Sequence, residues 1–162
     1  MASRLSRERI DAIYASDLSR ALDTARAIAA PHALDVASDP RLREFAFGAW
    51  EGLTWAEVIA TRPHLQQAGW TGVDAYTPEG GETFAHVRAR VAEFVRELAP
   101  RHPAGHLVIV THAGAVHAAM QEFGFSNEGV TILPASLTRF AMEDGRARLI
   151  TVSDVRHHDS SG

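Results

Sequence analysis

The sequence has 162 residues, 46% of them hydrophobic and 22% charged, with a net charge of −4. This length and composition fit one globular domain with a sizeable core, and the negative charge offers no global basic field to nucleic acid. The chain has no cysteine, which excludes disulfides, thiolate metal sites and a cysteine nucleophile.

The N-terminal residues 1–16 include basic residues but no apolar run behind them, so they do not have the pattern of a signal peptide. No apolar stretch approaches the ~20 residues that a membrane span needs. All 16 basic residues are Arg, so an anion site must be built from Arg, His and backbone N–H groups. We expect a cytoplasmic protein without a membrane or nucleic-acid partner.

The first predicted elements are the last turns of a helix at residues 2–9 and a short buried strand at residues 12–15. A helix follows, with Asp17 as its expected N-cap and Pro31 as its stop. Its apolar face consists of Leu18, Ala21, Leu22, Ala25 and Ile28.

The middle of the chain is rich in turns. Residues 34–52 show little strand pattern, and Thr54 with Glu57 forms a capping-box pattern that starts the next helix. Residues 63–82 hold several Gly and Pro and predict a long surface excursion. Residues 83–99 repeat apolar positions at helical spacing and predict an amphipathic helix.

The C-terminal third alternates strand and helix again. The clearest strand of the sequence, residues 106–111, leads directly into a helix that runs to about Phe123. Residues 137–142 and 147–152 are typical of a terminal pair of strands, and residues 154–162 of a polar tail. We therefore predict a single α/β domain over residues 1–162, a three-layer sandwich with a mostly parallel sheet.

Two strand-to-helix junctions, residues 14–20 and 110–114, carry polar groups at the carboxyl end of a predicted strand. Ligands of open α/β sheets bind there, and free N–H groups of a helix N-terminus suit an anion. Arg20 and His112 would offer two donor or cationic side chains to one anion. Taken singly, an Arg in a first helical turn is more often a solvated surface residue, and a His ending a strand more often structural.

The segment 41–52 holds two carboxylates, Glu44 and Glu51, framed by the aromatic residues Phe45, Phe47 and Trp50. An apolar setting favours the protonated form of a carboxylic acid, which suits proton delivery. A loop pinned by its aromatic residues, with both acids in water, explains the pattern equally well. A fourth segment, residues 78–83, brings two glycines to a helix N-terminus, which is a weak signal for a phosphate cradle.

These four segments resemble, in order and approximate spacing, the motifs of the histidine phosphatase superfamily, which includes the phosphoglycerate mutases and many small phosphatases. The matching stretches are YASDLSRALDTA, LREFAFGAWEG, PEGGET and VTHAG. The resemblance spans roughly residues 10 to 152. It implies a phosphoglycerate mutase-like fold and a phosphohistidine mechanism that acts on a small phosphorylated metabolite.

The resemblance also implies residue roles. Arg20 would hold the phosphoryl oxygens, and His112 would contact the same group and stabilise its charge during transfer. Ser16 and Ala113, which flank these positions, would belong to the phosphate site. Glu44 would protonate the leaving oxygen and later activate water. No metal and no cofactor are expected, because cationic side chains would neutralise the phosphate.

The family's nucleophile lies in an Arg-His-Gly motif after the first strand, and this sequence does not contain the triplet. None of the candidates His32, His64, His86, His102 or His157 follows an apolar strand and precedes Gly. We therefore expect the chain to lack the first strand and most of the first helix, which would leave unpaired edges in the sheet. We also expect the chain to be inactive by itself, as an N-terminal truncation rather than a natural pseudoenzyme.

Other functions stay open. A non-catalytic module that binds phosphorylated ligands would use the same pocket. A phosphoglycerate mutase is disfavoured, because those enzymes carry insertions that a chain this short lacks. A metal site at His157 and His158 is disfavoured because adjacent residues rarely face one ion. An incomplete sheet would favour pairing with a second copy of the chain.

Overall fold

Four apolar residues form β1 (Ala12–Ala15), the middle strand of a parallel sheet with the order β2-β1-β3. Its neighbours are β2 (Val36–Ser38) and β3 (Leu107–Val110). The structure is a computed structural model and describes residues 1–63, 65, 77–143 and 145–158. Because β1 and β3 run in parallel, with Ala15 paired to Val110, both strands end at the same edge of the sheet.

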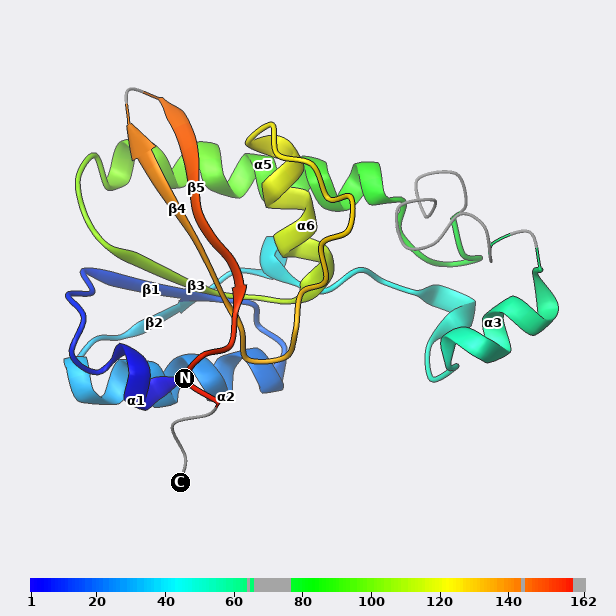
Figure 1. The fold of residues 1–162 in the computed structure, drawn as a ribbon, viewed down its shortest axis with the longest axis horizontal. Helices are drawn as coiled ribbons and strands as arrows, with labels where there is room; N and C mark the ends of the chain where they lie inside the picture. Colours follow the sequence, from blue (N-terminus) through cyan, green and yellow to red (C-terminus); the bar gives the residue numbers. More distant parts are fainter. Residues whose placement is uncertain (64, 66–76, 144, 159–162) are drawn as a thin grey trace.

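Helices cover both faces of this sheet (Figure 1). The helices α1 (Ala2–Leu5) and α2 (Ser19–Ala29) lie on one face, and α5 (Phe84–Arg101) lies on the other. The period of two in β1 explains this, since Ile13 joins a buried cluster with α2 and Tyr14 one with α5. The helix α6 (Ala113–Glu122) packs on α5. The predicted three-layer α/β sandwich is confirmed.

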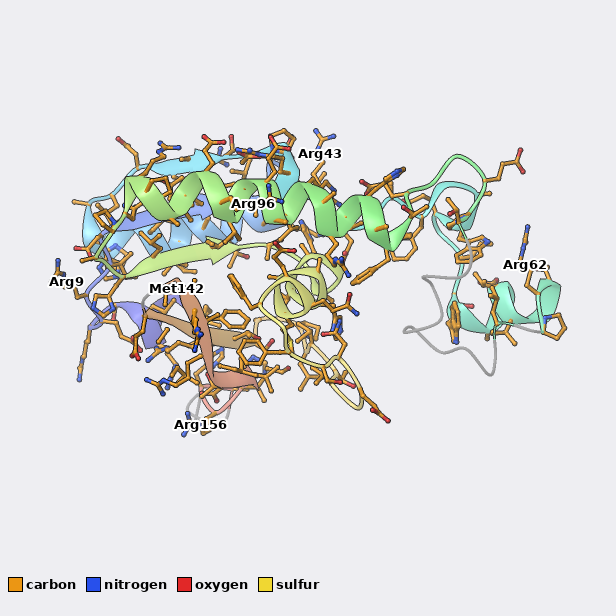
Figure 2. The ribbon with its side chains drawn as sticks, turned by 90° about the horizontal axis from the view of Figure 1, so that it is seen from above. Arg9, Arg43, Arg62, Arg96, Met142 and Arg156 are labelled. Atoms are coloured by element: carbon orange, nitrogen blue, oxygen red, sulfur yellow. The ribbon has the colours of Figure 1, made fainter. Side chains whose placement is uncertain are left out.

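The last two strands, β4 (Leu137–Glu143) and β5 (Arg146–Asp154), form the predicted terminal pair and run antiparallel. They form a sheet of their own, and Figure 2 shows this hairpin on the side of β3 away from β1. Among the described strands, β3 pairs only with β1, and Ile109 of β3 is 38% exposed. Among the described residues, β3 is therefore an edge strand of the parallel sheet.

The remaining elements are shorter. The helix α3 (Trp55–Thr61) begins with the predicted capping box, in which Thr54 and Glu57 bond each other's backbone N–H. It lies away from the sheet (Figure 1) and packs on Trp50. Single 3₁₀ turns lie at Ala30–His32, Pro40–Leu42 and Gly48–Trp50.

Two local predictions were wrong, and one short strand was not predicted. The N-cap of α2 is Leu18 rather than Asp17, because the Asp17 carboxylate binds the Arg43 guanidinium instead, at 2.5 and 2.7 Å. The stretch 34–52 contains β2, which is too short to show a strand pattern. Asp154 does not start a tail; it ends β5, and its carboxylate pairs with Arg156 at 2.6 Å.

Most of the predicted surface excursion, residues 64 and 66–76, lies outside the described residues. In the part that the structure describes, none of the helices has the length and apolar character needed to cross a membrane.

Candidate active site

The carboxyl ends of β1 and β3 bring the two predicted junctions together. The Ser16 N–H, just after β1, donates to the Val110 carbonyl at the end of β3, at 2.9 Å. Ser16 is fully buried, and its Oγ accepts a hydrogen bond from the Leu18 N–H at 3.3 Å. The first turn of α2 therefore begins beside the last residue of β3, as the parallel arrangement predicts.

His112 is the N-cap residue of α6 and is partly buried. Burial, as the largest cause, and the positive charges of Arg20 and Arg90 together lower the pKa of its imidazole to about 4. Its Nε2 is buried and has no hydrogen-bond partner in the described structure. The side chain is thus a neutral imidazole at pH 7, in a cationic environment, with one nitrogen unused by the protein.

Arg20 and Ala113 flank His112 from two helices. Arg20 lies in the first turn of α2, is exposed, and is close enough for its charge to act on His112. Ala113 is the exposed first residue of α6, so its N–H group belongs to the first helical turn, whose amides suit an anion. The Arg20 guanidinium and the two helix N-termini thus bring positive charge and free N–H donors to this edge of the sheet, beside the neutral imidazole.

Glu44 reaches the same edge from the segment before α3. Its Oε1 accepts two backbone hydrogen bonds, from Phe45 N–H at 2.9 Å and from Gly114 N–H at 3.0 Å. The second bond places the carboxylate against the first turn of α6, two residues after His112. A Cβ atom at position 114 would overlap Glu44 Oε1, so this contact requires glycine.

The second predicted carboxylate, Glu51, has a different environment. Its Oε1 accepts from the Phe47 N–H at 2.9 Å and so closes a turn within its own loop. Of the two acids in the aromatic segment, only Glu44 contacts α6. The sequence pattern did not separate them, and the resemblance selected Glu44.

The segment 78–83 supports Glu44 rather than offering an open phosphate cradle. Its Glu79 carbonyl accepts from Ala49 N–H and its Glu82 N–H donates to the Ala46 carbonyl, both at 2.9 Å. Gly48, with φ of +51°, lies so close that a Cβ atom there would overlap the Glu79 carbonyl. A Cβ atom at Gly81 would likewise overlap the Ala46 carbonyl, whereas one at Gly80 would meet no atom within 4 Å. Gly48 and Gly81 therefore allow one loop to pack closely against the other.

Arg90 is the main residue that the sequence interpretation missed. It lies on α5, and its guanidinium binds both Glu82 and the backbone of the segment that carries Glu44. Nothing in the sequence distinguishes it from Arg88 and Arg96 on the same helix. The five predicted residues Ser16, Arg20, Glu44, His112 and Ala113 lie at one edge of the sheet, and their roles stay predictions.

The described residues hold no group of three or more His, Asp or Glu side chains suited to a metal ion. His157 and His158 contact each other edge to face, with ring centroids 4.6 Å apart.

The low pKa of His112 predicts a pH-dependent stability. The folded-state pKa is about 4 and the unfolded value 6.5, so the unfolded chain binds more protons between these pH values and stability falls as the pH drops through this window. Because His112 is only partly buried, we expect a loss of about 1–2 kcal/mol. Urea unfolding at pH 7 and pH 4.5 measures it. A His112→Asn variant should lose less stability than the wild type over this range, and an equal loss would contradict the prediction.

Comparison with known proteins matches residues 1–155 to the family model described as "Histidine phosphatase superfamily (branch 1)". The chain is 32% identical over 168 aligned residues to a metal-independent phosphoserine phosphatase of Arabidopsis thaliana, covering 100% of this chain and 69% of the relative. It is 34% identical to phosphoglycerate mutase-like protein 4 of the same plant, covering 100% of this chain and 73% of the relative.

Among solved structures, the fold matches a mycobacterial glucosyl-3-phosphoglycerate phosphatase in complex with VO3, with a TM-score of 0.85 and 30% identity. The superposition covers 94% of this chain and 81% of that one. The similarity thus extends over nearly all of this chain, and each of these three proteins is longer than the part matched.

Proposed function

The chain belongs to the histidine phosphatase superfamily, and we propose that it carries the phosphate-binding and general-acid parts of a phosphomonoester hydrolase. One observation carries this proposal. The Glu44 carboxylate is held 3.0 Å from the Gly114 N–H, in the first turn of the helix that His112 caps. The side chains that we propose as the acid and as a phosphate ligand therefore lie at one helix N-terminus.

Phosphate binding and proton transfer would belong to different residues. Arg20, His112 and the first-turn amides of α6 would bind the non-bridging phosphoryl oxygens and the charge that develops on them. In the first step the phosphoryl group would pass to the nucleophilic His that the resemblance implies, and Glu44 would give a proton to the leaving oxygen as its bond to phosphorus breaks. In the second step water would attack phosphorus and lose a proton to Glu44, while the bond from phosphorus to the His nitrogen breaks and inorganic phosphate is released.

Hydrolysis is better supported than the mutase reaction. The names of two of the compared proteins are those of phosphatases, and the third is mutase-like. The Phe-Gly-Ala-Trp-Glu-Gly stretch at 47–52 also resembles the small phosphatases. We propose a small phosphorylated metabolite as substrate.

We propose that the nucleophile is the missing part, since the 162 residues contain no Arg-His-Gly triplet. The free edge of β3 suits a further parallel strand, whose carboxyl end would lie beside His112. We propose that the chain by itself does not turn over phosphoesters. We also propose that a strand ending in Arg-His-Gly restores activity; the chain preceded by such a segment is called the strand-completed protein below.

Hydrolysis of p-nitrophenyl phosphate tests both statements. The chain of 162 residues should show no turnover above the buffer, whereas the strand-completed protein should show turnover that is lost when the added His is changed to Ala. Activity of the chain alone would overturn the first statement. A folded but inactive strand-completed protein would overturn the assignment as a hydrolase.

A second candidate function is a non-catalytic module that binds phosphorylated ligands, and the same missing triplet favours it. The two proposals differ in what the strand-completed protein does, whereas both expect the chain alone to bind phosphate. Calorimetry of the chain with inorganic phosphate and sugar phosphates tests binding. The absence of both heat and a thermal shift would rule out the binding module.

Arg20 provides a sharper test of the binding site. We expect Arg20→Ala to weaken phosphate binding about 10- to 100-fold, because a charge-assisted hydrogen bond contributes about 1.5–3 kcal/mol. The matched control is Arg26→Ala, on the same helix, where Arg26 is exposed and pairs with Asp23 at 3.2 Å. Calorimetry should show near wild-type affinity for the control. Equal affinities of both variants would remove Arg20 from the site.

A further inference from the structure

The guanidinium of Arg90 makes an unusually large set of contacts with one irregular segment. Its Nη1 donates to the carbonyls of Arg41 and Arg43 at 2.7 and 2.8 Å, and its Nη2 donates to the carbonyl of Glu44 at 3.1 Å. The side chain is only 17% exposed. One side chain of α5 thus donates hydrogen bonds to three carbonyl groups of the segment that carries the candidate acid.

The segment needs such support because it has no regular structure of its own. Residues 43–47 belong to neither a helix nor a strand, so no backbone ladder determines where Glu44 points. Side chains elsewhere in the chain hold the segment, in addition to backbone bonds such as that from the Glu82 N–H to the Ala46 carbonyl. Besides Arg90, Thr111 Oγ1 donates to the Leu42 carbonyl at 2.7 Å.

Glu82 binds both Arg90 and the segment that carries Glu44. Its carboxylate accepts two hydrogen bonds from Arg90, both at 3.0 Å, and a third from the Ala46 N–H at 3.1 Å. Burial acts to raise the pKa of Glu82, but the bonds from Arg90 and Ala46 outweigh it and the pKa is lowered. The ion pair therefore stays charged at neutral pH and binds the segment at both ends of residues 44–46.

We infer that Arg90 and Glu82 are a positioning pair, which fixes the Glu44 carboxylate against the Gly114 N–H beside His112. The inference rests on the proposed function only in calling Glu44 the acid. Arg90 acts on the carbonyl of Glu44 and so determines the direction of its side chain. Its positive charge also acts on His112, so the same residue influences both functional side chains.

Amide hydrogen exchange of the 162-residue chain, followed by NMR, tests the inference directly. The Gly114 N–H bonds Glu44 and the Ala46 N–H bonds Glu82, so their protection reports the position of the segment. In Arg90→Met we expect both amides to exchange about 10-fold faster or more. Amides that bond between the ends of β1 and β3, such as the Ser16 N–H, should be as well protected from exchange as in the wild type.

The matched control is Arg96→Met, since Arg96 is exposed on the same helix (Figure 2). It is the same Arg-to-Met substitution and removes the same positive charge. The exchange rates of the Gly114 and Ala46 amides should stay as in the wild type. Arg90→Lys should give intermediate rates, because a lysine retains the charge but lacks the forked donors that reach three carbonyls.

Unchanged exchange at Gly114 in Arg90→Met would overturn the inference, as would an equal acceleration at Gly114 and at the β1–β3 amides. If Arg90→Met does not fold, Glu82→Gln decides in its place. It removes the ion pair but keeps an acceptor, and the Gly114 amide should exchange faster. Exchange needs no turnover, so a chain that only binds phosphate would still give these results, and failure of the hydrolase assignment would be recognised separately.

Discussion

Replacing Glu44 with Gln in the strand-completed protein is expected to lower kcat by about 10²- to 10⁴-fold, the usual contribution of a general acid–base group. The substitution suits the site, because the amide oxygen of Gln can still accept the bonds from Phe45 N–H and Gly114 N–H. The side chain therefore keeps its place and loses only its proton transfer. Binding of inorganic phosphate should change little.

Steady-state kinetics with two substrates separates the two roles of Glu44. An alkyl phosphate needs a proton on its leaving oxygen, whereas p-nitrophenolate leaves without one, so the alkyl substrate should suffer the larger loss. The control is Glu51→Gln, which alters the other carboxylate of the same segment. An equal effect of both variants, or no effect of Glu44→Gln on either substrate, would show that Glu44 is not the acid.

Gly48→Ala is expected to destabilise the protein by about 2–4 kcal/mol. Alanine is strained at a φ of +51°, which costs about 1 kcal/mol. In addition, its Cβ would overlap the Glu79 carbonyl and Gly81 N, and such overpacking costs typically 1–3 kcal/mol. Urea unfolding measures the sum.

Gly52→Ala is the matched control, because Gly52 also has a positive φ, +78°, but has no atom within 4 Å of the added Cβ. Its cost should stay near 1 kcal/mol, the backbone contribution alone. The difference between the two variants then measures how tightly the loop with Gly48 packs against the segment 79–81. Equal losses would mean that the two loops are not in close contact in solution.

The secondary structure was largely predictable because its signals are local. The apolar run of β1, the capping box of α3 and the helical spacing of α5 depend on neighbours only a few residues away. The wrong prediction for Asp17 shows the limit. As a local signal it favours an N-cap, but Arg43, 26 residues further along, binds the carboxylate instead.

The sequence also determined the main residues of the candidate site. Arg20 and His112 follow strands that are both apolar throughout, as buried parallel strands are, and parallel strands place their carboxyl ends at one edge. That argument, joined to the family resemblance for Glu44, was enough to bring the three side chains together. The same resemblance predicts a further strand with an Arg-His-Gly turn, and that strand stays a prediction.

The tertiary structure alone decided how Glu44 is held. The bond from Gly114 N–H joins residues 70 positions apart, and Arg90 reaches the carbonyl of Arg41 across 49 positions. Contacts of this kind leave no periodic or local signal, and Arg90 looks in the sequence like any other charged residue on the polar side of a helix. The sequence thus determined which chemical groups the site contains, whereas long-range side-chain-to-backbone hydrogen bonds determined where the acid points.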